Sequence, residues 1–202
     1  SMDKKLYDMM DWAGIEELVY SESSNPHRLL GAHVTEEGLL VQAFIPTAAS
    51  VSVKLKSSGK KYEMEMEDEA GFFAVLIPRK KPGAYTLAVT FDNGTVQEMD
   101  DPYAFAPQID EQELKKFEAG ICYDIYEKLG AHITEIDGVK GVYFAVWAPC
   151  AMRVSVTGDF NMWDGRRHQM RKLGDSGVFE LFIPGLDAGC VYKYEVKAPN
   201  GD

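Results

Sequence analysis

The sequence Leu-Gly-Ala-His stands at residues 30–33 and returns at residues 129–132. Two longer motifs follow it in the same order each time: Pro-x-Ala-x-x-Val-Ser-Val at 46–53 and 149–156, then Gly-x-Phe-x-x-x-Ile-Pro at 71–78 and 177–184. The spacing between the copies grows only by small insertions. Ordered matches of this kind indicate a tandem duplication, in which each copy is one structural unit of roughly 100 residues.

Each copy is predicted to form short β-strands, because apolar residues alternate with polar ones between closely spaced turns. In the first copy, the inward-facing residues are expected in five strands: Leu39/Val41/Ala43/Ile45, Val51/Val53/Leu55, Tyr62/Met64/Met66, Phe73/Val75/Ile77 and Tyr85/Leu87/Val89. Asn93-Gly94 predicts a type I′ hairpin turn. We therefore expect a mainly all-β protein of two tandem immunoglobulin-like antiparallel β-sandwiches, over residues 1–107 and 108–202.

Short helices are expected before each sandwich. Residues 15–20 offer one amphipathic segment, and Asp110 with Glu113 predicts a capping box for a helix that Gly120 can end. Between the copies, residues 99–107 are acidic and then rich in proline and aromatic residues. This composition favours an ordered linker that packs against a sandwich.

Composition excludes several classes of partner. The formal net charge of −11, without a local basic cluster, disfavours nucleic acid and anionic membranes. No apolar run approaches the length of a membrane span. Three cysteines, Cys122, Cys150 and Cys190, lack metal-like or redox-like spacing, so we expect buried free thiols and a cytoplasmic location.

The two copies differ most after the strand that ends at Val156. There the second copy has Gly-Asp-Phe-Asn-Met-Trp-Asp-Gly at 158–165, whereas the first has no aromatic residue at 54–59. Trp163 can stack on a pyranose ring, and Lys193, which alternates with Tyr192 and Tyr194, points away from the core. The alternative is that Trp163 folds back as a hydrophobic plug and Lys193 is a solvated surface charge.

Other conspicuous residues favour structural roles. Trp147 lies within a strand and is expected to pack on the sheet, and His33 and His132 occupy equivalent positions, which indicates a shared structural hydrogen bond. Glu63, Glu65, Glu67 and Glu69 are expected on a solvated strand face. No catalytic residue, metal site or cofactor is predicted, because no nucleotide loop, nucleophile elbow or metal-ligand spacing is present.

Four segments carry a family resemblance: residues 123–132, 144–149, 158–165 and 178–184. The chain closely resembles the N-terminal region of 1,4-α-glucan (glycogen) branching enzymes, in which an extra sandwich precedes an isoamylase-type carbohydrate-binding sandwich. The resemblance implies that α-glucan, such as glycogen or a maltooligosaccharide, is the ligand and that Trp163, Asn161 and Lys193 contact it. It also implies a catalytic (β/α)₈ barrel of the same polypeptide beyond Asp202.

Comparison of the two copies indicates that the second sandwich ends one strand early, because the sequence stops inside Asn200-Gly201, the turn that matches Asn93-Gly94. A sheet edge is then expected to be exposed. The resemblance leads to a further expectation and two alternatives. The second sandwich should bind or guide α-glucan, while the first positions the barrel and affects the length of the transferred chain. The alternatives are that both sandwiches are purely structural, or that the fragment comes from a related debranching enzyme.

Overall fold

The computed structural model describes residues 4–121 and 124–199. Cys122 and the expected turn at Asn200-Gly201 lie outside the described residues. The chain divides into two compact units. Unit 1 comprises Ser1–Tyr20 and His27–Ala104, and unit 2 comprises Ser21–Pro26 and Phe105–Asp202.

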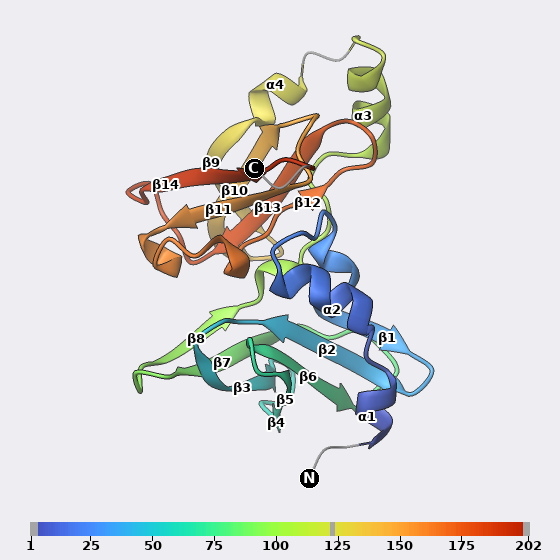
Figure 1. Ribbon diagram of the computed structural model, residues 1–202, viewed down its shortest axis with the longest axis vertical. Helices are drawn as coiled ribbons and strands as arrows, with labels where there is room; N and C mark the ends of the chain where they lie inside the picture. The colour runs from blue at the N-terminus through green and yellow to red at the C-terminus, as the bar shows by residue number, and fades with distance from the viewer. Residues whose placement is uncertain (1–3, 122–123, 200–202) are drawn as a thin grey trace. The chain divides into compact units, whose positions relative to one another are not determined.

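Unit 1 consists of two antiparallel sheets (Figure 1). The first sheet has the order β1-β2-β6-β5, with β1 at Gly31–Thr35, β2 at Gly38–Phe44, β6 at Phe72–Ile77 and β5 at Glu65–Asp68. The second has the order β4-β3-β7-β8, with β4 at Lys61–Glu63, β3 at Ala48–Leu55, β7 at Tyr85–Phe91 and β8 at Val96–Asp100. Their facing side chains form the core of the unit.

Unit 2 repeats this plan. One sheet has the order β12-β13-β10-β9, with β12 at Arg171–Lys172, β13 at Val178–Pro184, β10 at Val139–Trp147 and β9 at Gly130–Ile136. The other pairs β11 at Arg153–Gly158 with β14 at Tyr192–Lys197. The strand orders match those of unit 1, so the prediction of a mainly β protein with two sandwich-like domains is confirmed.

Short helices accompany the sandwiches. They are α1 (Lys4–Asp8), α2 (Trp12–Val19), η1 (Pro26–Arg28), η2 (Pro102–Ala104), α3 (Glu111–Glu118), α4 (Ile125–Lys128), η3 (Asp159–Asn161) and η4 (Gly165–Arg167). Asp110 caps α3 as expected, because its side chain accepts a hydrogen bond from the backbone N–H of Glu113. Within the described residues, none of the helices has the length and apolar character needed to cross a membrane.

The repeated glycine and proline meet in space. Gly71 and Gly177 both have positive φ, and a Cβ at either position would approach the Cα of Pro46 or Pro149 within 3.0 Å or 2.8 Å, respectively. Only glycine permits this close approach without strain. The two distant motifs of each copy are therefore one contact in the folded unit.

The alternation expected in unit 1 holds for most core residues but is wrong at the edge strand β5. Met66 is 42% exposed, whereas Glu67 is buried. The register of β5 against β6 shifts between Met66 and Asp68, and such a bulge reverses which side chains face inward. Glu67 thus does not belong to the solvated face that its spacing predicted.

Two further local predictions are wrong. The turn at Asn93-Gly94 is not type I′, because among its two central residues only Gly94 has positive φ, and the Gly94 N–H bonds to the carbonyl of Phe91. Cys150 is exposed and Cys190 half-buried, rather than both buried. Cys150 follows Pro149 in the turn between β10 and β11. The backbone of this turn leaves the Cys150 side chain exposed to solvent, although its neighbours in the sequence are apolar.

The linker is ordered, as its composition predicted. In unit 1, Tyr85 donates a hydrogen bond of 2.7 Å to the carboxylate of Asp101, which also accepts from the backbone N–H of Tyr103. Burial raises the pKa of both Tyr85 and Asp101. In unit 2, Phe105 packs edge-on against Phe182.

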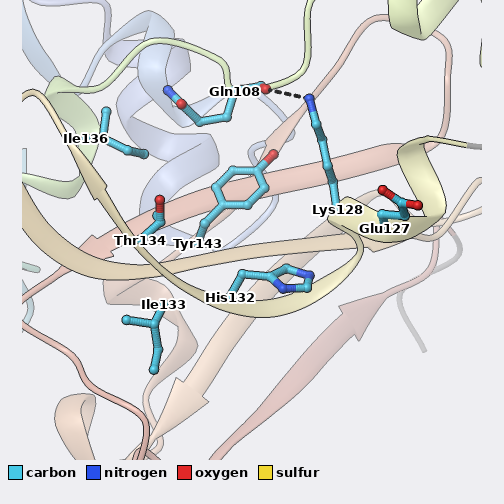
Figure 2. Close-up of a pocket in the computed structure, with 8 residues that line it drawn as sticks. All are labelled: Gln108, Glu127, Lys128, His132, Ile133, Thr134, Ile136 and Tyr143. Carbon is cyan, nitrogen blue, oxygen red and sulfur yellow. Dashed lines mark hydrogen bonds between the residues drawn. The ribbon is translucent and has the colours of Figure 1, made fainter.

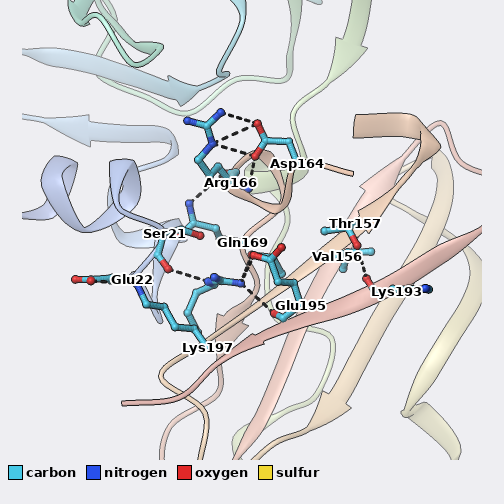
Figure 3. A network of polar contacts seen from close by, with 12 residues as sticks. Ser21, Glu22, Val156, Thr157, Asp164, Arg166, Gln169, Lys193, Glu195 and Lys197 are labelled. Carbon is cyan, nitrogen blue, oxygen red and sulfur yellow. Dashed lines mark hydrogen bonds and ion pairs between the residues drawn. The ribbon is translucent and has the colours of Figure 1, made fainter. Parts of the chain in front are cut away.

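Residues Ser21–Pro26 join unit 2 although they precede most of unit 1 in sequence. The buried Arg153 donates to the carbonyl oxygen of Ser21 and forms an ion pair of 2.9 Å with Glu195 (Figure 3). Lys197 pairs with Glu22 in the same network. The duplication gave no sign of this contact, because its two parts lie more than a hundred residues apart.

We predict that Tyr85→Phe destabilises unit 1 by about 1–3 kcal/mol, since a buried carboxylate loses its donor. Hydrogen exchange at the amides of β7 measures the free energy of opening for unit 1 separately from unit 2. Tyr7→Phe, at a half-exposed position of the same unit, should leave that exchange unchanged. Equal protection in both variants would contradict the role given to the Tyr85–Asp101 bond.

Candidate functional site

A compact loop follows β11 and occupies residues 158–165, the segment in which the two copies differ most. Glycines define both of its ends. A Cβ on Gly158 would lie 2.4 Å from the ring of Phe160, and one on Gly165 would lie 2.8 Å from Cβ of Ser155. The loop therefore packs closely on the outer face of β11, and the glycines of the motif are needed for that contact.

Asn161 holds this loop together from inside. Its side chain is 4% exposed. The carbonyl oxygen accepts from the N–H of Gly158 at 3.0 Å, while the amide nitrogen donates to the carbonyl of Val156 and to Nδ1 of His168, both at 2.9 Å. Both amide protons and the amide oxygen of Asn161 are thus used within the protein.

His168 is buried beside the loop and is neutral. Burial lowers its pKa to about 3, with the charge of Arg167 acting in the same direction. Because the amide of Asn161 donates to Nδ1, the ring proton resides on Nε2. The ring also meets Phe160 edge-on at 5.4 Å. A neutral histidine with a fixed tautomer is therefore part of the support for the loop.

The tip of the loop presents Met162 and Trp163. Both have positive φ, at 54° and 61°, which is rare for residues other than glycine and stores local strain. Trp163 is 42% exposed, and its indole N–H donates to Asp159 at 3.0 Å. The indole is thus held in one orientation with part of its surface open to solvent.

Asp164 and Arg166 fix the far side of the loop. The guanidinium of Arg166 donates to both carboxylate oxygens of Asp164. The distance is 3.0 Å to Oδ1, and the two contacts with Oδ2 measure 2.7 Å and 3.2 Å. The hydrogen bonds from Arg166 hold the pKa of Asp164 below its usual range. This forked ion pair restricts the backbone that follows Trp163.

Lys193 lies on the neighbouring strand β14. It pairs with Thr157, one residue before the start of the loop, and its carbonyl accepts from the Thr157 hydroxyl (Figure 3). Tyr192 and Tyr194 turn toward Phe144 on the other face of the sheet. Lys193 is exposed, so its expected orientation away from the core is the one observed.

The three residues predicted as a site differ in setting. Trp163 and Lys193 are solvent-accessible and come from the loop and from the strand next to its root, whereas Asn161 is interior. His168 was missed as a supporting residue. Its spacing from other histidines and carboxylates gives no metal or triad pattern, and its bond to Asn161 appears only when the loop folds back on β11.

The remaining sequence candidates are structural in this geometry. His33 and His132 each place Nε2 at hydrogen-bond distance from the carbonyl three residues earlier, at 3.0 Å and 2.7 Å, which confirms a shared bond. Trp147 does not pack in the core as expected: it is 51% exposed, and its ring meets Phe117 of α3 edge-on. Among the residues that the structure describes, no cluster of three or more His, Cys, Asp or Glu side chains could hold a metal ion.

The buried His168 predicts a pH dependence of stability. In the unfolded chain His168 is protonated below about pH 6.5, whereas in the folded chain it stays neutral down to about pH 3. The free energy of unfolding therefore falls by about 1.4 kcal/mol for each pH unit between these two values as the pH is lowered. His168→Gln should be less stable at pH 7 but lose less stability on acidification. Urea unfolding at pH 7, 6 and 5 tests this, and parallel pH profiles for the two proteins would contradict it.

Comparison with solved structures returns enzymes that act on α-glucans. The catalytic module of the pneumococcal glycogen-degrading virulence factor SpuA is 22% identical over 47% of this chain and 15% of its own, with a TM-score of 0.33. A Paenibacillus barengoltzii pullulanase with maltotetraose is 18% identical over 63% of this chain and 20% of its own, with a TM-score of 0.34. The chain thus spans a fifth or less of the length of these proteins.

Family models give a firmer result. Residues 11–103 match the model described as alpha-1,4-glucan branching enzyme GlgB, N-terminal domain. Residues 128–202 match the model described as carbohydrate-binding module 48, or isoamylase N-terminal domain. The chain therefore contains a GlgB N-terminal domain at residues 11–103, followed by a carbohydrate-binding module 48 domain at residues 128–202.

Proposed function

We propose that unit 2 binds α-glucan through Trp163 and Lys193, as part of a branching enzyme. The observation that carries the proposal is the partly exposed indole of Trp163, fixed by its bond to Asp159 on a loop that Asn161 ties down. An indole face stacks on the C–H face of a pyranose. A rigid ring loses little conformational entropy when a sugar binds.

Lys193 complements the aromatic surface. Its ammonium group supplies three hydrogen-bond donors next to the root of the loop, and sugar hydroxyls are acceptors as well as donors. Asn161 serves mainly as a positioning residue, because its polar atoms are engaged inside the loop. That Asn161 also contacts the glucan stays a prediction.

Unit 1 is proposed as a positioning module. Where unit 2 has the aromatic loop, β3 of unit 1 runs into a tight hairpin in which the N–H of Leu55 bonds to the carbonyl of Lys60. This hairpin offers no stacking surface. We infer that unit 1 orients a catalytic barrel that follows Asp202 in a cytoplasmic parent enzyme and affects the length of the chain that the barrel transfers from an α-1,4 to an α-1,6 linkage.

Trp163→Ala is expected to weaken β-cyclodextrin binding roughly tenfold or more, because the stacking surface is lost. Isothermal titration calorimetry measures the affinity of both proteins. Trp12→Phe is the matched control, since Trp12 has a similar exposed fraction of 38% but lies in unit 1. Equal binding by the wild type and Trp163→Ala, or none by either, would favour the purely structural alternative.

Lys193→Met is expected to weaken binding a few-fold while leaving the unfolding midpoint unchanged, because the side chain is exposed and its backbone contacts remain. Lys140→Met, at an exposed position on the other sheet of unit 2, removes the same charge from the protein and should leave affinity unchanged. If both variants lose affinity equally, the effect comes from net charge and not from a contact at Lys193.

A further inference from the structure

A separate pocket of about 280 Å³ lies in unit 2, on the sheet that contains β9 and β10 (Figure 2). The Trp163 loop belongs to the other sheet of the unit. Tyr143 of β10 contributes an aromatic ring, and His132 and Thr134 of β9 line the same space with Glu127 and Lys128 of α4 and with Gln108, which precedes α3. Four parts of unit 2 thus converge on one small pocket.

The aromatic ring in the pocket is held rigidly. Tyr143 is buried, and its hydroxyl donates to Glu180 at 2.9 Å. Glu180 is itself held by an ion pair of 2.6 Å with Arg171 and by the backbone N–H of Gln108. The ring therefore cannot turn away from the cavity without breaking a buried polar network.

The polar groups around the pocket retain unused hydrogen-bonding capacity. Nε2 of His132 donates to the carbonyl oxygen of Leu129 at 2.7 Å, so Nδ1 is the ring nitrogen that this contact does not use. The half-buried hydroxyl of Thr134 and the exposed carboxylate of Glu127 line the same space, where the hydroxyl can donate or accept and the carboxylate can accept. Lys128 donates to the carbonyl of Gln108 and to Glu113, and one of its three protons remains.

This combination selects a neutral ligand that both donates and accepts hydrogen bonds. An anion is disfavoured because the single ammonium of Lys128 is already paired with Glu113 and Glu127 adds a further negative charge. A purely apolar ligand would bury several polar groups without partners. The volume is at the low end of ligand pockets and admits one sugar ring, not an oligosaccharide.

We propose that this pocket is a second carbohydrate site, which takes a single hexose residue at the end of an α-glucan chain. The size and polar lining of the pocket are the basis for a hexose as the ligand. That this hexose is glucose rests on the proposed function. The glucan would then contact unit 2 at two places of different kind: an aromatic surface at Trp163 and a small, open pocket beside Thr134 that holds the chain end.

The test is a titration of ¹⁵N-labelled protein followed by NMR, with three sugars. Glucose and maltotriose have free ends, whereas β-cyclodextrin has none. We expect glucose and maltotriose to give saturable shifts at the amides of Lys128 and Thr134 in the millimolar range, and β-cyclodextrin to shift only the amides of the Trp163 loop. Tighter binding of maltotriose than of glucose supports a site for a glucan end, whereas equal binding of the two sugars contradicts it and assigns the pocket to a free monosaccharide.

Two variants probe the pocket and one serves as control. Thr134→Val keeps the shape of the side chain on β9 but removes its hydroxyl. Glu127→Gln removes a charge at an exposed position of α4. Each variant should raise the dissociation constant obtained from the shifts threefold or more. Glu135→Gln, on the opposite face of β9, should have no effect. Absence of saturable shifts at Lys128 and Thr134, or equal shifts with β-cyclodextrin, overturns the proposal. The β-cyclodextrin response at Trp163 reports independently on the proposed function.

Discussion

Each sandwich starts at a glycine that the fold cannot replace. Gly31 and Gly130 have φ values of 92° and 96°, and in unit 1 a Cβ at this point would lie 2.5 Å from the carbonyl oxygen of Tyr103. The histidine two residues later closes the turn by bonding the carbonyl of the preceding leucine. This left-handed turn sets the direction in which the first strand of each sheet starts, and a residue with a Cβ would be strained there.

The same backbone rule applies differently in the loop at residues 158–165. There, left-handed backbone falls on Met162 and Trp163, which are not glycines, so the conformation carries a cost of about 1–3 kcal/mol per residue. The buried bonds of Asn161 and the forked pair of Asp164 with Arg166 offset that cost. Strain at the exposed tryptophan, balanced by support beneath it, is what an organised binding surface requires.

The two units share a fold but differ in the segment that follows the central strand. Both keep the contact between the repeated proline and glycine, and both keep the histidine bond of the first turn. Only unit 2 replaces the hairpin after the central strand with a loop that buries an asparagine and a histidine. The pocket beside Thr134 also depends on the linker and α4, which fold over the outer sheet of unit 2.

Sequence alone determined the tandem repeat, the strand faces of the core and the cap of α3, because these depend on neighbours within a few residues or on a period of two. It also pointed to Trp163 and Lys193 as residues that differ between the copies. The tertiary structure decided the rest. The interior place of Asn161 and the neutral state of His168 depend on how the loop folds back on β11, which the order of residues in the loop does not reveal. The return of residues 21–26 to Arg153 joins segments more than a hundred residues apart, which no local pattern encodes. The bulge that buries Glu67 likewise arises from pairing with β6 and not from the spacing of its own strand.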